Sequence, residues 1–223
     1  MKGFLVGLAI VAAGLMAAPP SADALLFNLD SNHCTVPADC GPPNTIFGTV
    51  TLTQVGPSDG TGTTHFDVHL NSPYDFAKTG SADFQSFKFN AIGIVLADIT
   101  VTQNAPKPLA AAGPGTFNGD GTGDFAWAIG CPTCGNGLSD GFNSDIIFDV
   151  INSKISDFTA PNNLGNVFVA DVGNTNNGAT GPIDASGGGV GGSTIPEPAT
   201  LILLGSGLLG LGLAGRVRSL LRR

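Results

Sequence analysis

The residues with the most evident chemistry are four cysteines, Cys34, Cys40, Cys131 and Cys134. The N-terminal leader described below places them outside the cytoplasm, where an even number of cysteines predicts disulfides. The simplest of the three possible pairings closes two local loops, Cys34–Cys40 and Cys131–Cys134. Two alternatives stay open: a zinc site formed by all four thiolates, and a redox-active thiol pair in the segment Cys-Pro-Thr-Cys.

Oxygen-bearing side chains alternate in the segment NGDGTGD, residues 118–124. They belong to Asn118, Asp120, Thr122 and Asp124. Calcium loops place oxygen ligands at alternate positions and a glycine at the sixth position, which Gly123 occupies here. The spacing predicts a weak Ca²⁺ site, although Ile129 stands where such a loop carries its bidentate carboxylate. The alternative is a glycine-rich hairpin turn that needs no cofactor.

A second candidate metal site is the segment His65-Phe66-Asp67-Val68-His69. On a β-strand, alternate side chains point to the same face, so His65, Asp67 and His69 lie together. Two imidazoles and a carboxylate are zinc or copper ligands, and His33 is a candidate for the next position. The alternative is the polar, solvent-facing side of a half-buried strand.

Two glycine motifs resemble enzyme signatures but lack the surroundings that those enzymes need. Residues 205–210, GSGLLG, match a dinucleotide-binding fingerprint, yet too little chain follows for the second strand and its acidic residue. Residues 137–141, GLSDG, match a nucleophile elbow, yet the last histidine, His69, precedes Ser139. A glycan-active hydrolase that uses two aspartates stays an alternative, although the sequence places no such pair.

The elements that must position these residues are predicted to be β-strands. Residues 63–70, TTHFDVHL, and 46–55, IFGTVTLTQV, alternate apolar and polar side chains. In residues 83–90, Phe87 and Phe89 point to the face opposite Lys88. In residues 124–130, Trp127 lies on an apolar face and is expected in the core. Tyr74 is then the only evident aromatic side chain on which a sugar could stack. Several short strands separated by Gly, Pro and Asn clusters predict a mainly β fold, a β-sandwich or jelly-roll-like body over residues 25–172.

The predicted body is strongly acidic. Between residues 25 and 194 the chain has fifteen Asp, no Glu and four Lys, a formal charge of −11. Such a surface repels nucleic acid phosphates and anionic lipids, so nucleic acid is not an expected partner, while divalent cations and neutral sugars are compatible with it. Residues 173–194 are rich in Gly, Ser and Asn and are predicted to be a linker.

The N-terminus has the three parts of a secretory signal peptide. Lys2 is followed by an apolar run at residues 4–16 and by Ala22-Asp23-Ala24, which matches an A-x-A cleavage site. We expect a signal helix over residues 1–24, signal peptidase cleavage after Ala24, and Leu25 as the first mature residue.

The C-terminus also has three parts in a fixed order. Pro196, Glu197 and Pro198 form a stiff, extended segment. Residues 201–214 contain no charge and are predicted to form a short transmembrane helix, about 21 Å long. Four arginines follow, and the positive-inside rule keeps them cytoplasmic; they are Arg216, Arg218, Arg222 and Arg223.

Residues 195–223 resemble a PEP-CTERM sorting signal in motif, span and basic cluster. The resemblance implies recognition by an exosortase, a membrane-embedded cysteine protease-like enzyme. It also implies delivery to the envelope, the surface or the exopolysaccharide matrix of a Gram-negative bacterium, with only transient membrane insertion. The resemblance is confined to this tail and implies nothing about the activity of the body.

The expected function is therefore that of an exported envelope or matrix protein with a non-enzymatic structural or adhesive role. The first alternative is a calcium- or polysaccharide-binding module, and the second is the glycan-active hydrolase mentioned above. Apart from Ca²⁺, no cofactor is expected.

Overall fold

The computed structural model describes residues 23–34, 39–42, 44–79, 85–103 and 107–186. The predicted sorting motif and the two predicted terminal helices lie outside these ranges, apart from Asp23 and Ala24 at the cleavage site. Within the described ranges no helix is long and apolar enough to cross a membrane. The same ranges are mainly β, as predicted, with two short 3₁₀ helices, η1 (Leu96–Asp98) and η2 (Ile155–Phe158).

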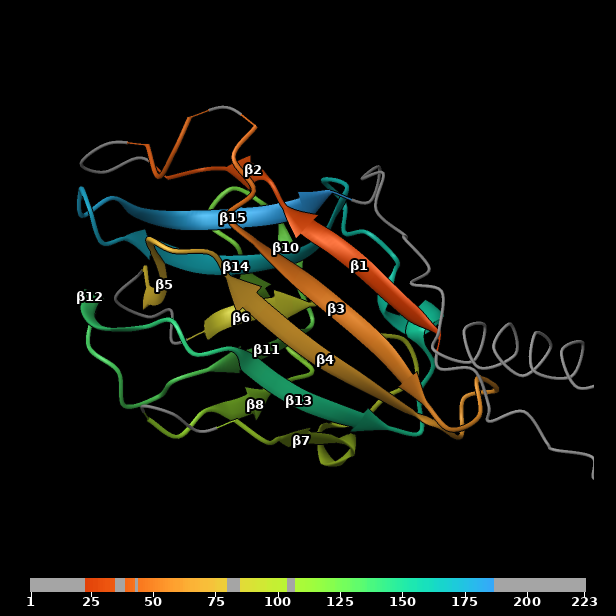
Figure 1. The fold of residues 1–223 in the computed structure, drawn as a ribbon. Coiled ribbons are helices and arrows are strands. Elements are labelled where there is room, and N and C mark those ends of the chain that lie inside the picture. The colour runs from red at the N-terminus through yellow and green to blue at the C-terminus, as the bar shows by residue number, and fades with distance from the viewer. Residues whose placement is uncertain (1–22, 35–38, 43, 80–84, 104–106, 187–223) are drawn as a thin grey trace, which may run out of the picture. The chain divides into compact units, whose positions relative to one another are not determined.

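The first sheet has five antiparallel strands in the order β1-β3-β4-β13-β7 (Figure 1). Their bounds are β1 Ala24–Leu29, β3 Gly48–Val55, β4 Thr63–Leu70, β13 Ile146–Ile151 and β7 Ile99–Val101. Burial alternates along β3 and β4 as the sequence predicts, with Val50, Leu52, Phe66 and Val68 facing inward. This alternation leaves one face of the sheet apolar and the other polar.

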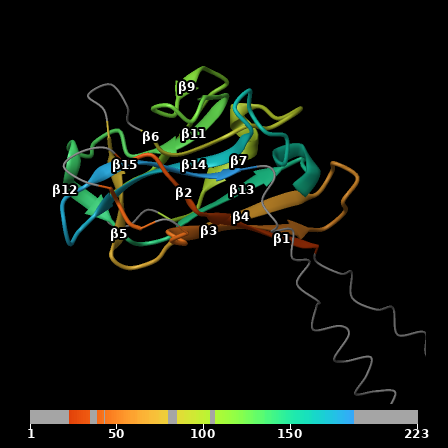
Figure 2. The ribbon, with the colours of Figure 1, turned by 90° about the horizontal axis from the view of Figure 1, so that it is seen from above.

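The second sheet follows the order β12-β5-β14-β6-β11-β8, with β15 along the other edge of β14 and β2 beside β15. Its strands are β12 Gly137–Phe142, β5 Tyr74–Lys78, β14 Asn166–Asn174, β6 Gln85–Phe89, β11 Trp127–Gly130, β8 Ala110–Ala112, β15 Thr180–Ser186 and β2 Ser31–Asn32. A hairpin of β9 (Phe117–Asn118) and β10 (Asp124–Phe125) is separate. Figure 2 shows the two sheets as layers, with β9 beyond the second sheet.

Phenylalanine rings fill the space between the sheets. Phe66 stacks on Phe148 of its own sheet, with ring centroids 4.4 Å apart, and meets Phe158 edge-on at 4.9 Å. From the second sheet, Phe89 and Phe168 approach Phe66 to 5.6 and 6.2 Å. Because both sheets contribute to one core cluster, the body is a β-sandwich, and Trp127 belongs to that core as predicted.

The linker predicted for residues 173–194 is wrong over its first part, because β14 runs to Asn174 and β15 occupies Thr180–Ser186. Two described glycines of this segment, Gly173 and Gly181, are closely packed. A Cβ atom on Gly181 would lie 2.5 Å from the Cα of Cys34, and one on Gly173 would lie 2.4 Å from the Leu138 side chain. These two glycines make tight contacts within the body, which extends at least to Ser186.

Replacing Phe66 by Ala is expected to lower the free energy of unfolding by about 3–5 kcal/mol, because it leaves a cavity among four packed rings. Urea unfolding followed by tryptophan fluorescence measures this change. The control is Val55→Ala at the exposed end of β3, where the side chain is 55% exposed and the expected change is within about 0.5 kcal/mol. Equal effects of the two substitutions would contradict the central position of Phe66.

Candidate functional site

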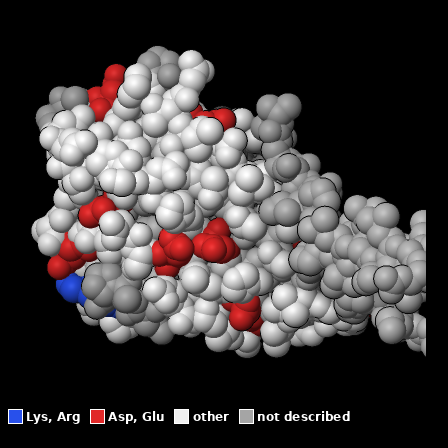
Figure 3. All heavy atoms as spheres, viewed as in Figure 1, with Lys and Arg blue, Asp and Glu red and all other residues white. Residues whose placement is uncertain are grey.

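The outward side of the first sheet is the candidate functional surface. We call it the outer polar face and define it by the outward residues of β3, β4 and β13 and of the turn before β13: Thr49, Thr51, Thr53, His65, Asp67, His69, Asp145, Ile147 and Asp149. Strand register places Thr53, His65 and Asp149 in one row across the sheet, and Thr51, Asp67 and Ile147 in the next. In the same view as Figure 1, acidic side chains gather over the middle of this surface (Figure 3).

Two histidine–aspartate pairs cross from β4 to β13 and the turn before it. His65 Nδ1 lies 2.7 Å from Asp149 Oδ1, and His69 Nδ1 lies 2.7 Å from Asp145 Oδ1. All four side chains are between a third and a half exposed. Since a carboxylate only accepts hydrogen bonds, each imidazole donates through Nδ1 and leaves Nε2 as its second polar atom.

Asp67 lies between the two histidines along β4. Partial burial raises the pKa of its carboxyl group, and the negative charge of Asp145 raises it further, while His65 and His69 act in the opposite direction. Its Oδ1 atom is buried and has no hydrogen-bond partner among the described residues. The sheet therefore holds this carboxylate where its charge is poorly solvated.

The metal interpretation of this segment is only partly supported. His65, Asp67 and His69 share a face as predicted, but both imidazoles pair with aspartates outside this segment. His33 lies beside the second sheet instead, with Nε2 2.7 Å from Asp184 Oδ2, so its proposed place near His65 is wrong. In the described parts of the chain, no three His, Cys, Asp or Glu side chains are arranged to hold a metal ion.

Asn118, Asp120, Thr122 and Asp124 form the β9–β10 hairpin turn. Asn118 donates from its amide to Asp124 at 3.2 Å and accepts the Asp120 backbone N–H at 2.7 Å. The Thr122 hydroxyl is buried and donates to the Gly119 carbonyl. The hairpin alternative describes this geometry, and Ca²⁺ binding stays a prediction.

The four cysteines form the two predicted local disulfides, Cys34–Cys40 and Cys131–Cys134. The four-thiolate zinc alternative is therefore wrong for this structure, while redox activity of the Cys131–Cys134 pair stays an untested alternative, because a redox-active pair forms the same disulfide when it is oxidised. Tyr74 is also unavailable as a sugar platform, because it is 6% exposed and donates its hydroxyl to the Cys40 carbonyl at 3.2 Å. The ring of Phe47 packs edge-on against the Tyr74 ring, a tertiary contact that the sequence alone does not reveal.

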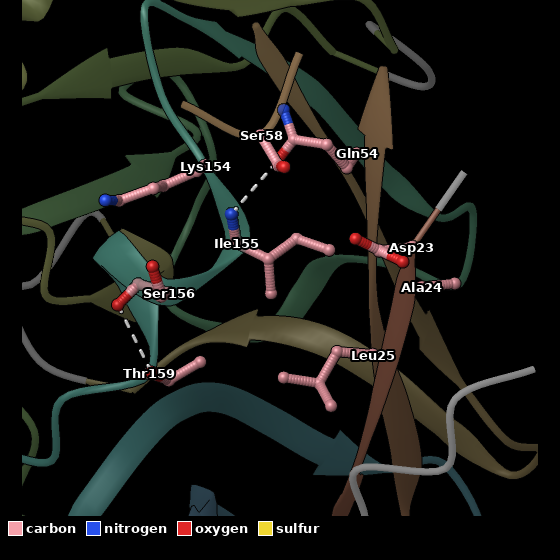
Figure 4. Close-up of a pocket in the computed structure, with 9 residues that line it drawn as sticks. All are labelled: Asp23, Ala24, Leu25, Gln54, Ser58, Lys154, Ile155, Ser156 and Thr159. Carbon is pink, nitrogen blue, oxygen red and sulfur yellow. Dashed lines mark hydrogen bonds between the residues drawn. The ribbon is translucent and has the colours of Figure 1, made fainter. Parts of the chain in front are cut away.

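A cavity of about 340 Å³ opens at the start of β1 (Figure 4). Leu25 and Ile155 form its apolar walls, and the buried Gln54 side chain anchors it by accepting the Ile155 backbone N–H at 3.1 Å. Asp23 is the single carboxylate among its described lining residues. Asp23 and Ala24 belong to the predicted leader, so the predicted cleavage after Ala24 would remove part of the cavity wall.

The PEP-CTERM protein-sorting motif matches residues 194–223, which confirms the resemblance of the tail. No curated protein and no solved structure matches the chain. The motif marks the chain as an exported protein that an exosortase, a membrane protein, sorts to the cell envelope or surface. The match leaves residues 23–186, the body described above, without an assigned activity.

Asp67→Asn is expected to raise the melting temperature at pH 7 by about 1–3 °C, because it removes a poorly solvated charge. The raised pKa of Asp67 means that the folded state holds its proton more tightly than the unfolded state. The destabilisation caused by the Asp67 charge is absent at pH values where the folded and unfolded states are both protonated. It grows as the pH rises through the raised pKa of the folded state. The advantage of Asp67→Asn should therefore shrink between pH 7 and pH 3.

Asp59→Asn is the matched control for that series. Hydrogen bonds from the Thr61 hydroxyl and backbone lower the pKa of Asp59, so its charged form stabilises the fold. Its replacement should lower the melting temperature at pH 7 and lose that effect on acidification. The same sign for both variants would contradict the electrostatic account of Asp67.

The predicted calcium site is tested by thermal unfolding with added Ca²⁺. A dissociation constant of about 1 mM, at the weak end for extracellular modules, would stabilise the protein by about 1.4 kcal/mol at 10 mM Ca²⁺. Asp124→Ala should abolish this shift, and Asp59→Ala should retain it. No Ca²⁺-dependent shift of the unfolding temperature in the parent protein, or an equal shift in Asp124→Ala, would contradict the predicted calcium site.

Proposed function

We propose that the body is a non-enzymatic structural or adhesive module of the cell surface of a Gram-negative bacterium, and that its outer polar face contacts neutral exopolysaccharide. Export uses the predicted signal peptide, with signal peptidase cleavage after Ala24. The predicted C-terminal helix then holds the chain in the membrane until the exosortase acts.

The observation that carries this proposal is the regular array of hydrogen-bonding groups on the outer polar face. Three threonines of β3 stand beside two histidines and an aspartate of β4, in register across strands about 4.8 Å apart. Hydroxyls, imidazoles and carboxylates donate to and accept from sugar hydroxyls. The acidic character of the body favours a neutral polymer over an anionic one.

The arrangement of the carboxylates supports a contact role over catalysis. Glycosidases place two carboxyl groups on either side of the scissile bond, in a site that encloses the sugar. Asp145 and Asp149 are instead engaged with imidazoles on an open sheet face. The cavity at the start of β1 offers Asp23 alone among its described lining residues.

The test compares two threonine-to-valine triple variants of the full chain in the native host. Thr49→Val, Thr51→Val and Thr53→Val remove hydroxyls from the outer polar face with little change of shape. The control replaces the exposed loop residues Thr61, Thr116 and Thr133 by Val. The face variant should bind the host's purified exopolysaccharide at least about 10-fold more weakly, since each lost hydrogen bond costs about 0.5–1.5 kcal/mol.

Deletion of residues 195–223 serves as the sorting control, and the deleted chain should be lost from the surface while its body still binds the polymer. Equal binding of the polymer by the face variant and the loop variant would contradict the proposal that the outer polar face is the contact surface. Release of new reducing ends from the polymer by the parent protein would instead establish an enzyme.

A further inference from the structure

The second sheet contains a fully buried lysine in contact with a fully buried aspartate. Lys88 of β6 and Asp171 of β14 are both 0% exposed, and Lys88 Nζ contacts Asp171 Oδ2. The two residues are 83 positions apart in the chain and lie on neighbouring strands. Lysine and aspartate are almost never fully buried in proteins unless they are paired.

Strand register explains how the two side chains meet. Lys88 lies directly opposite Val169, and Asp171 is two residues further along β14 on the same side. Such diagonal neighbours are about 7–8 Å apart, a distance that a long lysine side chain spans. Ala128 lies opposite Lys88 on the other side, and both Ala128 and Val169 are 0% exposed. The amine and the carboxyl group therefore meet between aliphatic neighbours.

A second buried carboxyl group lies on the same side of the sheet. Asp184 of β15 lies opposite Val169, so β14 separates it from Lys88, and it is 1% exposed. Burial raises the pKa of Asp184, and the neighbouring His33 only partly offsets this. A carboxyl group with a raised pKa is better suited than an ordinary aspartate to act as a general acid.

We propose that Lys88 and Asp171 become joined by an intramolecular isopeptide bond. The uncharged ε-amine attacks the Cγ carbon of the uncharged Asp171 acid, a C–N bond forms, and the C–OH bond breaks. The hydroxyl leaves as water with a proton that originates on the amine and is relayed by the Asp184 carboxyl group. The step is a condensation, so nothing is oxidised or reduced and no co-reactant is needed.

Three features of the site favour this reaction over a permanent ion pair. Burial removes the water that stabilises an ammonium and a carboxylate, which favours the uncharged, reactive forms of both groups. Folding holds the reacting atoms in contact, which replaces a bimolecular encounter by an intramolecular one. Exclusion of water also opposes hydrolysis of the amide once it has formed.

The bond would give the body a covalent constraint that its disulfides lack. The two disulfides join cysteines only six and three positions apart. A link between β6 and β14 closes a much longer loop and fastens two neighbouring strands of the second sheet. Unlike a disulfide, it would survive reducing conditions.

The test is the intact mass of the reduced full chain, compared with the mass calculated for the same chain ends. The isopeptide bond predicts a deficit of one water molecule and a cross-linked proteolytic peptide that contains Lys88 and Asp171. Succinimides at Asp-Gly sequences give the same deficit, but hydroxylamine opens them and leaves an isopeptide bond intact. A full mass with two separate peptides would overturn the proposal and leave a buried ion pair.

Substitutions at the reacting residues provide an independent check. Asp171→Asn should form the same bond with loss of ammonia, and so yield the same cross-linked peptide as the parent protein. Lys88→Met should restore the full mass, and Asp184→Asn should slow bond formation without changing the product. A mass deficit that persists in Lys88→Met would place the modification elsewhere and overturn the assignment. If Lys88→Met fails to fold, the masses of the parent protein and of Asp171→Asn still decide whether the bond forms.

Discussion

The body depends on the packing of phenylalanine rings around Phe66, which joins its two sheets. Facing sheets lie about 10 Å apart, and short strands contribute only a few inward side chains each. Large rings fill that gap with few residues, and their edge-to-face contacts restrict the orientation of one sheet on the other. The chain has 14 Phe but one Trp and one Tyr, so little of this core needs a hydrogen-bond partner.

The two sheets differ in how far their charged residues are exposed to solvent. The first sheet has a solvent-facing side, where water screens the His65–Asp149 and His69–Asp145 pairs. In the second sheet β14 is buried along its whole length, and Lys88 and Asp171 interact without such screening. The charged pairs of the first sheet are therefore hydrated, while the buried pair of the second sheet interacts away from solvent.

Location and contact are determined by separate parts of the chain. The sorting motif at residues 194–223 directs the protein to the envelope or surface, and its match begins after the last strand of the body, β15. The negative charge of the body disfavours contacts with other polyanions at that location. Two disulfides agree with an oxidising destination outside the cytoplasm.

Local patterns in the sequence were sufficient for the strands around Phe66, for both disulfides and for the sorting tail. Alternation has a period of two residues, the cysteine loops are short, and a sorting enzyme recognises a linear segment. The tertiary structure alone decided that residues 173–174 and 180–186 lie in strands, that Lys88 meets Asp171, and that His33 lies apart from His65. These features depend on which strands become neighbours and what covers each face, and such long-range pairing leaves no periodic signal in the sequence.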